Sequence, residues 1–182
     1  MNRAKLIIAV VLSFLTFFPV FAQRDADHLD GLKYKLLVSK GLEKVRLLYS
    51  LSQNQEISWD ERLQYVRQGL SLAKAQEFRE EIASGYRLLA SCLVETSMLQ
   101  VDSAFFYVDR SFELASYWKM PAVQAEAKLT KAKIAFSNKD PFGSLKLNEE
   151  AVEFAEQSED SLVLAKSLSQ LGGSYSSLRL DS

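Results

Sequence analysis

The feature that most constrains the fold is a regular recurrence of small side chains within helical sequence. Three segments share a pattern of small, apolar, polar and apolar residues followed by alanine: G-L-S-L-A from Gly69, S-F-E-L-A from Ser111, and A-V-E-F-A from Ala151. A second small residue follows each of them after 21 residues, at Ala90, Ala132 and Gly172. Two antiparallel helices approach closely only where a side chain is small, and each such pair buries its apolar stripe against the next pair. The spacing therefore predicts helix pairs that pack in one repeated way, with a unit close to 40 residues.

The remainder of the sequence also favours helices. Alternating β-branched runs and Asn-Gly turns, which would indicate strands, are missing, and Pro121 and Pro141 fall where helices are predicted to begin. We expect an all-α domain over 33–182, with helix pairs at about 33–76, 79–119 and 121–157 and an unpaired last helix at 160–179. The small residues expected at helix contacts are Gly69, Ala73, Ala90, Ser111, Ala115, Ala132, Ala151, Ala155 and Gly172.

Four helix starts can be placed from capping patterns. Ser58 followed by Glu61 forms a capping box, and Asp140 before Pro141 places an acceptor at the cap position. Asp102 and Asp160 each precede a serine and then an apolar helical pattern, so we expect them to cap two further helices.

The first 22 residues are expected to be a signal peptide. They carry Arg3 and Lys5, then an apolar run, and they close on V-F-A before Gln23, as a secretory signal requires. The alternative is an uncleaved membrane anchor, although the 16-residue apolar run is short for a spanning helix. A polar lead at 23–32 follows. We therefore expect an exported, periplasmic protein whose only possible membrane contacts are the signal segment and a C-terminal helix that this sequence does not contain.

Charge and motifs argue against nucleic-acid binding and catalysis. Without Arg3 and Lys5 the chain has 20 basic and 23 acidic residues, whereas a nucleic-acid binder would carry a basic surplus. His28, the only histidine, lies in the polar lead, and no paired cysteines, phosphate-binding loop or nucleophile motif occurs. Cys92 lies in an apolar helical pattern, which favours a buried thiol over a reactive one. We expect no enzyme activity, no metal and no cofactor.

The sequence resembles the tetratricopeptide repeat family. The matching stretches are D-S-A-F-F-Y-V-D-R-S-F-E-L-A from Asp102, L-T-K-A-K-I-A-F-S-N-K-D from Leu129, and L-G-G-S-Y from Leu171. The unit is longer than the family's usual ~34 residues. Lys131 stands where the family usually has leucine, and Leu48 where the first pair should have a small residue. The resemblance implies a right-handed α-solenoid of about three and a half repeats.

In that family the first helix of each pair lines a concave binding surface. Carried over by position, this surface would comprise Ser84, Arg87, Ser91, Glu126, Lys133, Lys166 and Ser169. Its three basic residues form a candidate strip for an acidic segment or a carboxylate, with ordinary solvated charges as the alternative. The resemblance implies a non-catalytic scaffold for a protein or peptide, in the setting of an extracytoplasmic sensing region of a signal-transduction protein with a histidine kinase or transcriptional regulator output.

The last predicted helix lacks a second helix to complete its pair. Leu168, Leu171 and Tyr175 would then lose part of their cover. We expect the chain to be the N-terminal piece of a longer protein. The alternative is a complete small periplasmic protein that self-associates through this helix or serves as an assembly adaptor.

Overall fold

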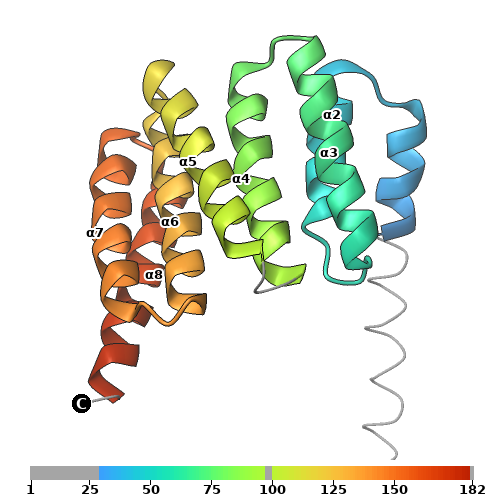
Figure 1. The fold of residues 1–182 in the computed structure, drawn as a ribbon. Coiled ribbons are helices and arrows are strands. Elements are labelled where there is room, and N and C mark those ends of the chain that lie inside the picture. Colours follow the sequence, from blue (N-terminus) through green and yellow to red (C-terminus); the bar gives the residue numbers. More distant parts are fainter. Residues whose placement is uncertain (1–28, 97–99, 181–182) are drawn as a thin grey trace, which may run out of the picture. The chain divides into compact units, whose positions relative to one another are not determined.

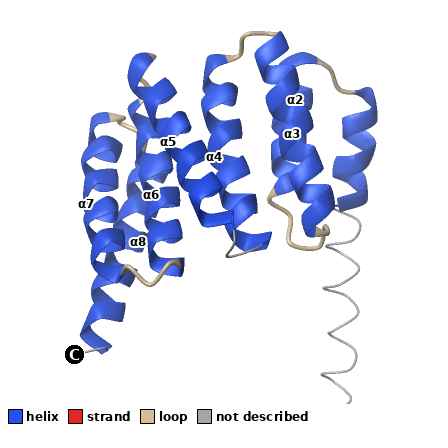
Figure 2. Ribbon diagram, viewed as in Figure 1, coloured by secondary structure: helices blue, strands red, loops and turns tan. Residues whose placement is uncertain are grey.

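A computed structural model of the chain describes residues 29–96 and 100–180. The expected signal peptide, and residues 23–28 of the polar lead with His28, lie outside the described residues. The all-α expectation is confirmed, because the described part consists of helices joined by short loops and contains no strand (Figure 2). The helices are α2 Gly41–Ser52, α3 Trp59–Ala75, α4 Arg79–Thr96, α5 Val101–Tyr117, α6 Pro121–Ser137, α7 Pro141–Gln157 and α8 Ser161–Leu180.

The first helix of the pair predicted at about 33–76 is divided in two. Residues 29–38 form a separate helix, and α2 begins only at Gly41. Gly41 has a φ of 55°, in the left-handed region that glycine adopts without steric cost. The compact unit that contains α2 to α8 begins at Lys40. The prediction followed the apolar pattern across this glycine and missed the break.

Three of the four predicted helix caps are confirmed. The Ser58 hydroxyl accepts a hydrogen bond from the Glu61 amide, and the Asp140 carboxylate accepts one from the Gly143 amide at 2.8 Å. Asp160 accepts from two amides of the first turn of α8. The prediction for Asp102 is wrong, because α5 begins at Val101 and Gln100 occupies the cap position. Asp102 lies instead in the first turn, where its negative charge interacts favourably with the positive end of the helix dipole.

Four inter-helix turns share one backbone conformation. Glu77, Lys119, Lys139 and Glu159 have φ values between 56° and 61°, and they follow α3, α5, α6 and α7 respectively. In the first three turns the next amide donates to the carbonyl oxygen five residues earlier, at 2.9 to 3.0 Å. This is the hydrogen bond that closes a Schellman motif, although none of the four residues is glycine. The chain therefore reverses direction in the same way after several helices.

The unit that begins at Lys40 has two layers of helices. Each helix from α2 to α8 contacts the next one, as expected for antiparallel neighbours joined by short loops (Figure 1). In addition α2 contacts α4, α4 contacts α6, and α6 contacts α8. The backbones of α3, α5 and α7 lie farther apart from one another, and α5 reaches α7 through the rings of Phe112 and Phe154, whose centroids are 5.4 Å apart. The even-numbered helices α2, α4, α6 and α8 thus form one continuous layer, and the other three helices cover its back.

Eight of the nine small residues expected at helix contacts are buried. A Cβ on Gly69 would lie 2.5 Å from Cε1 of Tyr49, so the Tyr49 ring occupies the space that a side chain would need. Ser111 adds a hydrogen bond to its packing, because its hydroxyl donates to the Ala83 carbonyl oxygen at 2.7 Å. These positions bring α3 and α5 close to their neighbours.

Gly172 is the exception, and its predicted role as a packing residue is wrong. It is exposed, and nothing lies within 4 Å of the position that its Cβ would take. The equivalent residues Ala90 and Ala132 lie in helices that are packed between both of their sequence neighbours, α4 between α3 and α5 and α6 between α5 and α7. Within the described residues α8 contacts only α7 and α6, so the outer side of α8 has no covering helix.

The two departures from the family pattern have local explanations. Leu48 is almost fully buried and lies 3.4 Å from the Cβ position of Gly69, so the small residue of that contact is contributed by α3 rather than by α2. Lys131 is half-buried, its Nζ pairs with Asp109 Oδ1 at 2.5 Å, and it lies over the Phe105 ring. Its aliphatic stem fills space between α5 and α6 while its ammonium remains paired.

Candidate functional site

The layer of even-numbered helices carries two adjoining hollows. The larger one, which we call the charged hollow, has a volume of about 740 Å³ and is lined by the α2–α3 loop, the start of α3, α4, α6 and α8. The smaller one, the Asn148 pocket, has a volume of about 430 Å³ and is lined by α4, α6, α7 and α8. The two share four lining residues, Ser91, Glu95, Thr130 and Lys133. They therefore form one groove across α4, α6 and α8.

Most residues predicted for a concave surface line this groove. Arg87, Glu126 and Lys166 line the charged hollow, Ser169 lines the Asn148 pocket, and Ser91 and Lys133 line both. Ser84 is half-buried on α4 and lines neither hollow. Residues at matching positions of successive helices are gathered here because α4, α6 and α8 lie side by side.

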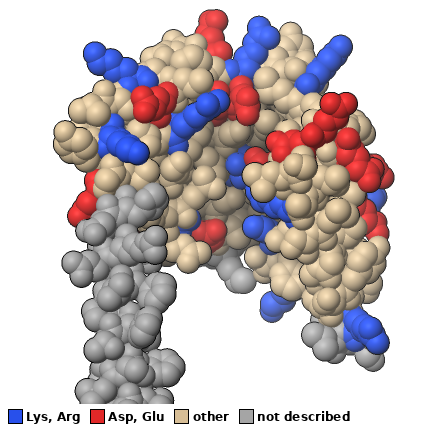
Figure 3. Space-filling view, turned by 180° about the vertical axis from the view of Figure 1, so that it is seen from behind, with Lys and Arg blue, Asp and Glu red and all other residues tan. Residues whose placement is uncertain are grey.

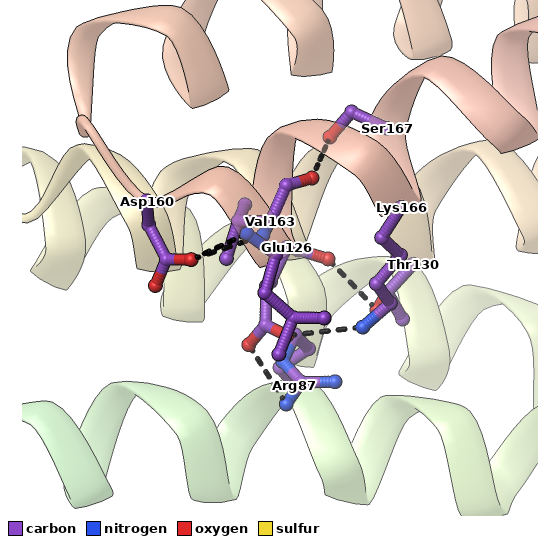
Figure 4. Close-up of polar contacts among 8 residues, drawn as sticks. Arg87, Glu126, Thr130, Asp160, Val163, Lys166 and Ser167 are labelled. Carbon is purple, nitrogen blue, oxygen red and sulfur yellow. Dashed lines mark hydrogen bonds and ion pairs between the residues drawn. The ribbon is translucent and has the colours of Figure 1, made fainter.

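Glu126 links three helices in the charged hollow. Its Oε2 forms an ion pair with Arg87 Nη2 at 3.1 Å, and its Oε1 accepts a hydrogen bond from Lys166 Nζ at 3.0 Å (Figure 4). Burial on its own would raise the pKa of this carboxyl, but the charges of Arg87 and Lys166 outweigh it and the pKa of Glu126 is lowered. Glu126 is therefore ionised at neutral pH and ties α4 and α8 to α6.

The predicted basic strip is corrected by this arrangement. Arg87 and Lys166 both pair with Glu126, whose single negative charge offsets one of their two positive charges. Lys133 differs from them, because it is exposed and forms no ion pair within the part of the chain that the structure describes. Basic and acidic side chains lie next to each other in a hollowed part of the surface (Figure 3). The groove is thus mixed in charge, and Lys133 is the cation of its lining that has no ion pair among the described residues.

Arg62 forms the far wall of the charged hollow, and the sequence patterns did not single it out. Its guanidinium donates from Nε to the Ser52 carbonyl oxygen at 2.6 Å, pairs with Glu95 at 3.2 Å and lies 4.3 Å from the centre of the Trp59 ring. It is buried although it is charged, which these three contacts compensate. Trp59 itself remains 42% exposed at the rim.

Asn148 is a deeply buried polar side chain of the smaller pocket. Its residue is 4% exposed, and its Nδ2 donates to the Ser174 hydroxyl at 2.7 Å. Its Oδ1 is buried and has no hydrogen-bond partner among the described residues. Sequence reasoning missed it, yet a signal was present, because Ser144, Asn148, Ala151 and Ala155 are spaced to lie on one face of α7.

Groups with strong chemical reactivity are not concentrated in the groove. Within 29–96 and 100–180 no cluster of three or more His, Cys, Asp or Glu residues is placed to hold a metal ion. Cys92 lines the charged hollow but is buried, and burial raises the pKa of its thiol to about 11. At neutral pH it is therefore a protonated thiol. Among the described helices none combines the length and apolarity needed to cross a membrane.

Comparison with known proteins gives no family for this chain. No protein-family model matches the sequence, and no curated protein matches it with significant similarity.

Proposed function

We propose that this chain is a non-catalytic scaffold that binds a segment of a partner protein or peptide in the groove on α4, α6 and α8. One observation carries the proposal: two hollows share four lining residues and extend along a single layer of neighbouring helices. The proposal includes a finer description of the fold, which is a right-handed α-solenoid of antiparallel helix pairs that resembles tetratricopeptide repeats. A layer in which each helix contacts the next but one, together with buried small residues at even intervals, supports that description.

The charge of the groove favours a peptide over a nucleic acid. Four cations line the charged hollow, but three acidic residues line it as well, and two of these pair with cations of the hollow. A nucleic-acid site would need a continuous basic surface to neutralise phosphates. An extended peptide suits a groove in which apolar walls alternate with paired charges, because its backbone and its side chains offer both kinds of contact.

For the biological setting we propose an exported protein that acts on the extracytoplasmic side, as the sensing region of a signal-transduction protein. The support is the amino-terminal sequence pattern and the resemblance described above. Fractionation of cells that produce the chain tests the location, since appearance of a form lacking residues 1–22 in the periplasmic fraction is the expected result. Retention of the whole chain in the cytoplasm would contradict export.

The binding proposal is tested by selecting partners on a peptide library and comparing matched arginine variants. Ser91 lines both hollows, so S91R places a long charged side chain in the groove. Ser103 is exposed on α5, away from the groove residues, and S103R is the control. We expect peptides selected by the unchanged chain to bind S103R equally and S91R at least ~10-fold more weakly. Equal binding to S91R would place recognition elsewhere.

Self-association through α8 is the second candidate, because its outer side exposes large apolar residues. Leu162 is 78% exposed, Leu168 51% and Tyr175 53%, and exposed large apolar residues can take part in an interaction site. Light scattering distinguishes the candidates. A concentration-dependent dimer that L168E converts to a monomer would support self-association, whereas a monomer at all concentrations would refute it.

A further inference from the structure

We propose that the Asn148 pocket is the specificity site of the groove, and that it accepts an apolar group that ends in a hydroxyl or an amide and carries an anion beside Lys133. This inference rests on the proposed binding function and names the chemistry that the groove selects. The same chemistry can be supplied by a free organic acid or by a residue of a bound peptide, and the experiment below separates these sources.

The first step is the unpartnered atom of Asn148. A buried polar atom without a hydrogen bond is unfavourable, and such atoms are rare in folded proteins. Asn148 Oδ1 is in this position, and the residue lines the pocket. The result does not depend on which amide atom is oxygen, since Ser174 Oγ can either accept or donate. In both orientations one amide atom remains for a ligand. A hydroxyl or an amide can satisfy it in either case.

The second step is the shape and composition of the pocket. Its volume of about 430 Å³ is in the range of small-molecule sites, roughly 300–1,000 Å³. Val94, Ile134 and Phe136 supply apolar lining, and serine and threonine hydroxyls from α4, α6, α7 and α8 supply much of the polar lining. This combination suits an apolar body with a polar end. A fully apolar ligand would leave the Asn148 amide unsatisfied.

The third step is the charge at the pocket. Lys133 and Glu95 are the charged residues that line it. The Glu95 carboxylate is held by Arg62, whereas Lys133 has no ion pair within the described part of the chain. Lys133 also lines the charged hollow, but the other three cations of that hollow already have ion pairs, Arg62 with Glu95 and both Arg87 and Lys166 with Glu126. Arg87 Nε is buried without a hydrogen-bond partner, although the guanidinium is paired. An anionic ligand therefore gains more beside Lys133 than elsewhere in the groove.

A blocking variant and its neighbour provide a matched test. Gly173 lines the pocket and Gly172 does not, and at both glycines nothing lies within 4 Å of the Cβ position. G173L should therefore fold and fill the pocket, while G172L adds the same side chain outside it. Because both replace a helical glycine at an exposed site, their effects on stability should be alike.

The probes are 4-hydroxyphenylacetate, phenylacetate and 4-hydroxyphenylacetamide, titrated by NMR into the full chain and its variants. We expect 4-hydroxyphenylacetate to shift the Asn148 side-chain amide resonances and to bind about fivefold more tightly than phenylacetate, which cannot satisfy the amide. The uncharged acetamide should bind more weakly as well, and K133M should remove that difference, while K146M on α7 should not. G173L should abolish binding and G172L should preserve it.

A capped dipeptide, acetyl-Glu-Tyr-amide, is the second arm. Tighter binding of the dipeptide than of 4-hydroxyphenylacetate identifies a peptide residue as the source, and the reverse order identifies a free acid. The proposal is overturned if no probe binds by ~10 mM, or if binding is the same in G173L as in the unchanged chain. A peptide selected on the groove that competes with no probe would leave the proposed scaffold function intact while refuting this pocket, so the two failures are distinguishable.

Discussion

Replacing Gly85 with alanine places one methyl group where α4 meets α2. The added Cβ would lie 2.2 Å from the Tyr49 hydroxyl oxygen, 3.0 Å from Tyr49 Cζ and 3.0 Å from Leu70 Cδ1. Tyr49 cannot withdraw easily, because it is buried and its hydroxyl donates to the Glu81 carbonyl oxygen at 2.8 Å. The ring must therefore move, and this hydrogen bond must lengthen or break.

The expected change in the free energy of unfolding of G85A is the sum of three contributions. Overpacking a core typically costs about 1–3 kcal/mol. Loss of the Tyr49 hydrogen bond adds roughly 1 kcal/mol. Alanine gains about 1 kcal/mol over glycine inside a helix, which opposes both. We expect G85A to lower the free energy of unfolding by about 1–3 kcal/mol. The same substitution at Gly172, which has open space around it, should instead raise that free energy by roughly 0.5–1 kcal/mol.

Urea unfolding followed by circular dichroism measures both variants, with Y49F and Y49F/G85A completing a double-mutant cycle. Phenylalanine lacks the hydroxyl that the new methyl group would meet, so G85A should cost less in the Y49F background. The reasoning is refuted if G85A and G172A change stability in the same direction. It is also refuted if the cost of G85A is unchanged by Y49F, because the conflict would then not involve the Tyr49 hydroxyl.

Three further substitutions and one labelling experiment test the local structure. E126Q should lower the free energy of unfolding by about 1–3 kcal/mol at pH 7. Because the folded-state pKa of Glu126 is lowered, the difference in stability between E126Q and the unchanged chain should shrink as the pH falls below roughly 4.3. A difference that stays constant from pH 7 to pH 3 would contradict this. K119G should stabilise by up to about 1 kcal/mol, because Lys119 has a φ of 57°, and a loss of stability would show that its side chain contributes more than its backbone costs. D140A should cost about 1 kcal/mol by removing the acceptor for the Gly143 amide, and no change would refute the cap. Cys92 should react with iodoacetamide only as fast as the protein opens, and rapid labelling of the folded chain at pH 7 would contradict its burial and raised pKa.

The periodic positions were predictable because they depend on local geometry. Small residues at 21-residue intervals place one small residue at an equivalent position along each successive helix, and most of these residues are buried in the structure. The caps at Ser58, Asp140 and Asp160 were also predictable, since a cap involves only the first turn of its own helix. Gly172 fits the same sequence pattern but is exposed, because burial depends on a second helix and not on the residue itself.

The groove shows the same division between local and long-range information. The resemblance to a repeat family was sufficient to place Arg87, Lys133 and Lys166 on one surface, and the structure brings them to one groove. Their pairing was not predictable, because Glu126 lies 39 residues from Arg87 and 40 from Lys166. Arg62 and Asn148 were missed for the same reason, since Glu95 and Ser174 reach them from other helices.

By itself the sequence determined that the chain is helical, where most helices begin and end, and which small residues recur along them. These properties follow from interactions within about one helical turn, which are set by neighbouring residues. Only the tertiary structure decided which charges compensate each other, which amide is left without a partner, and which side of α8 is uncovered. Such properties depend on contacts between residues far apart in the chain, and the packing of whole helices determines them.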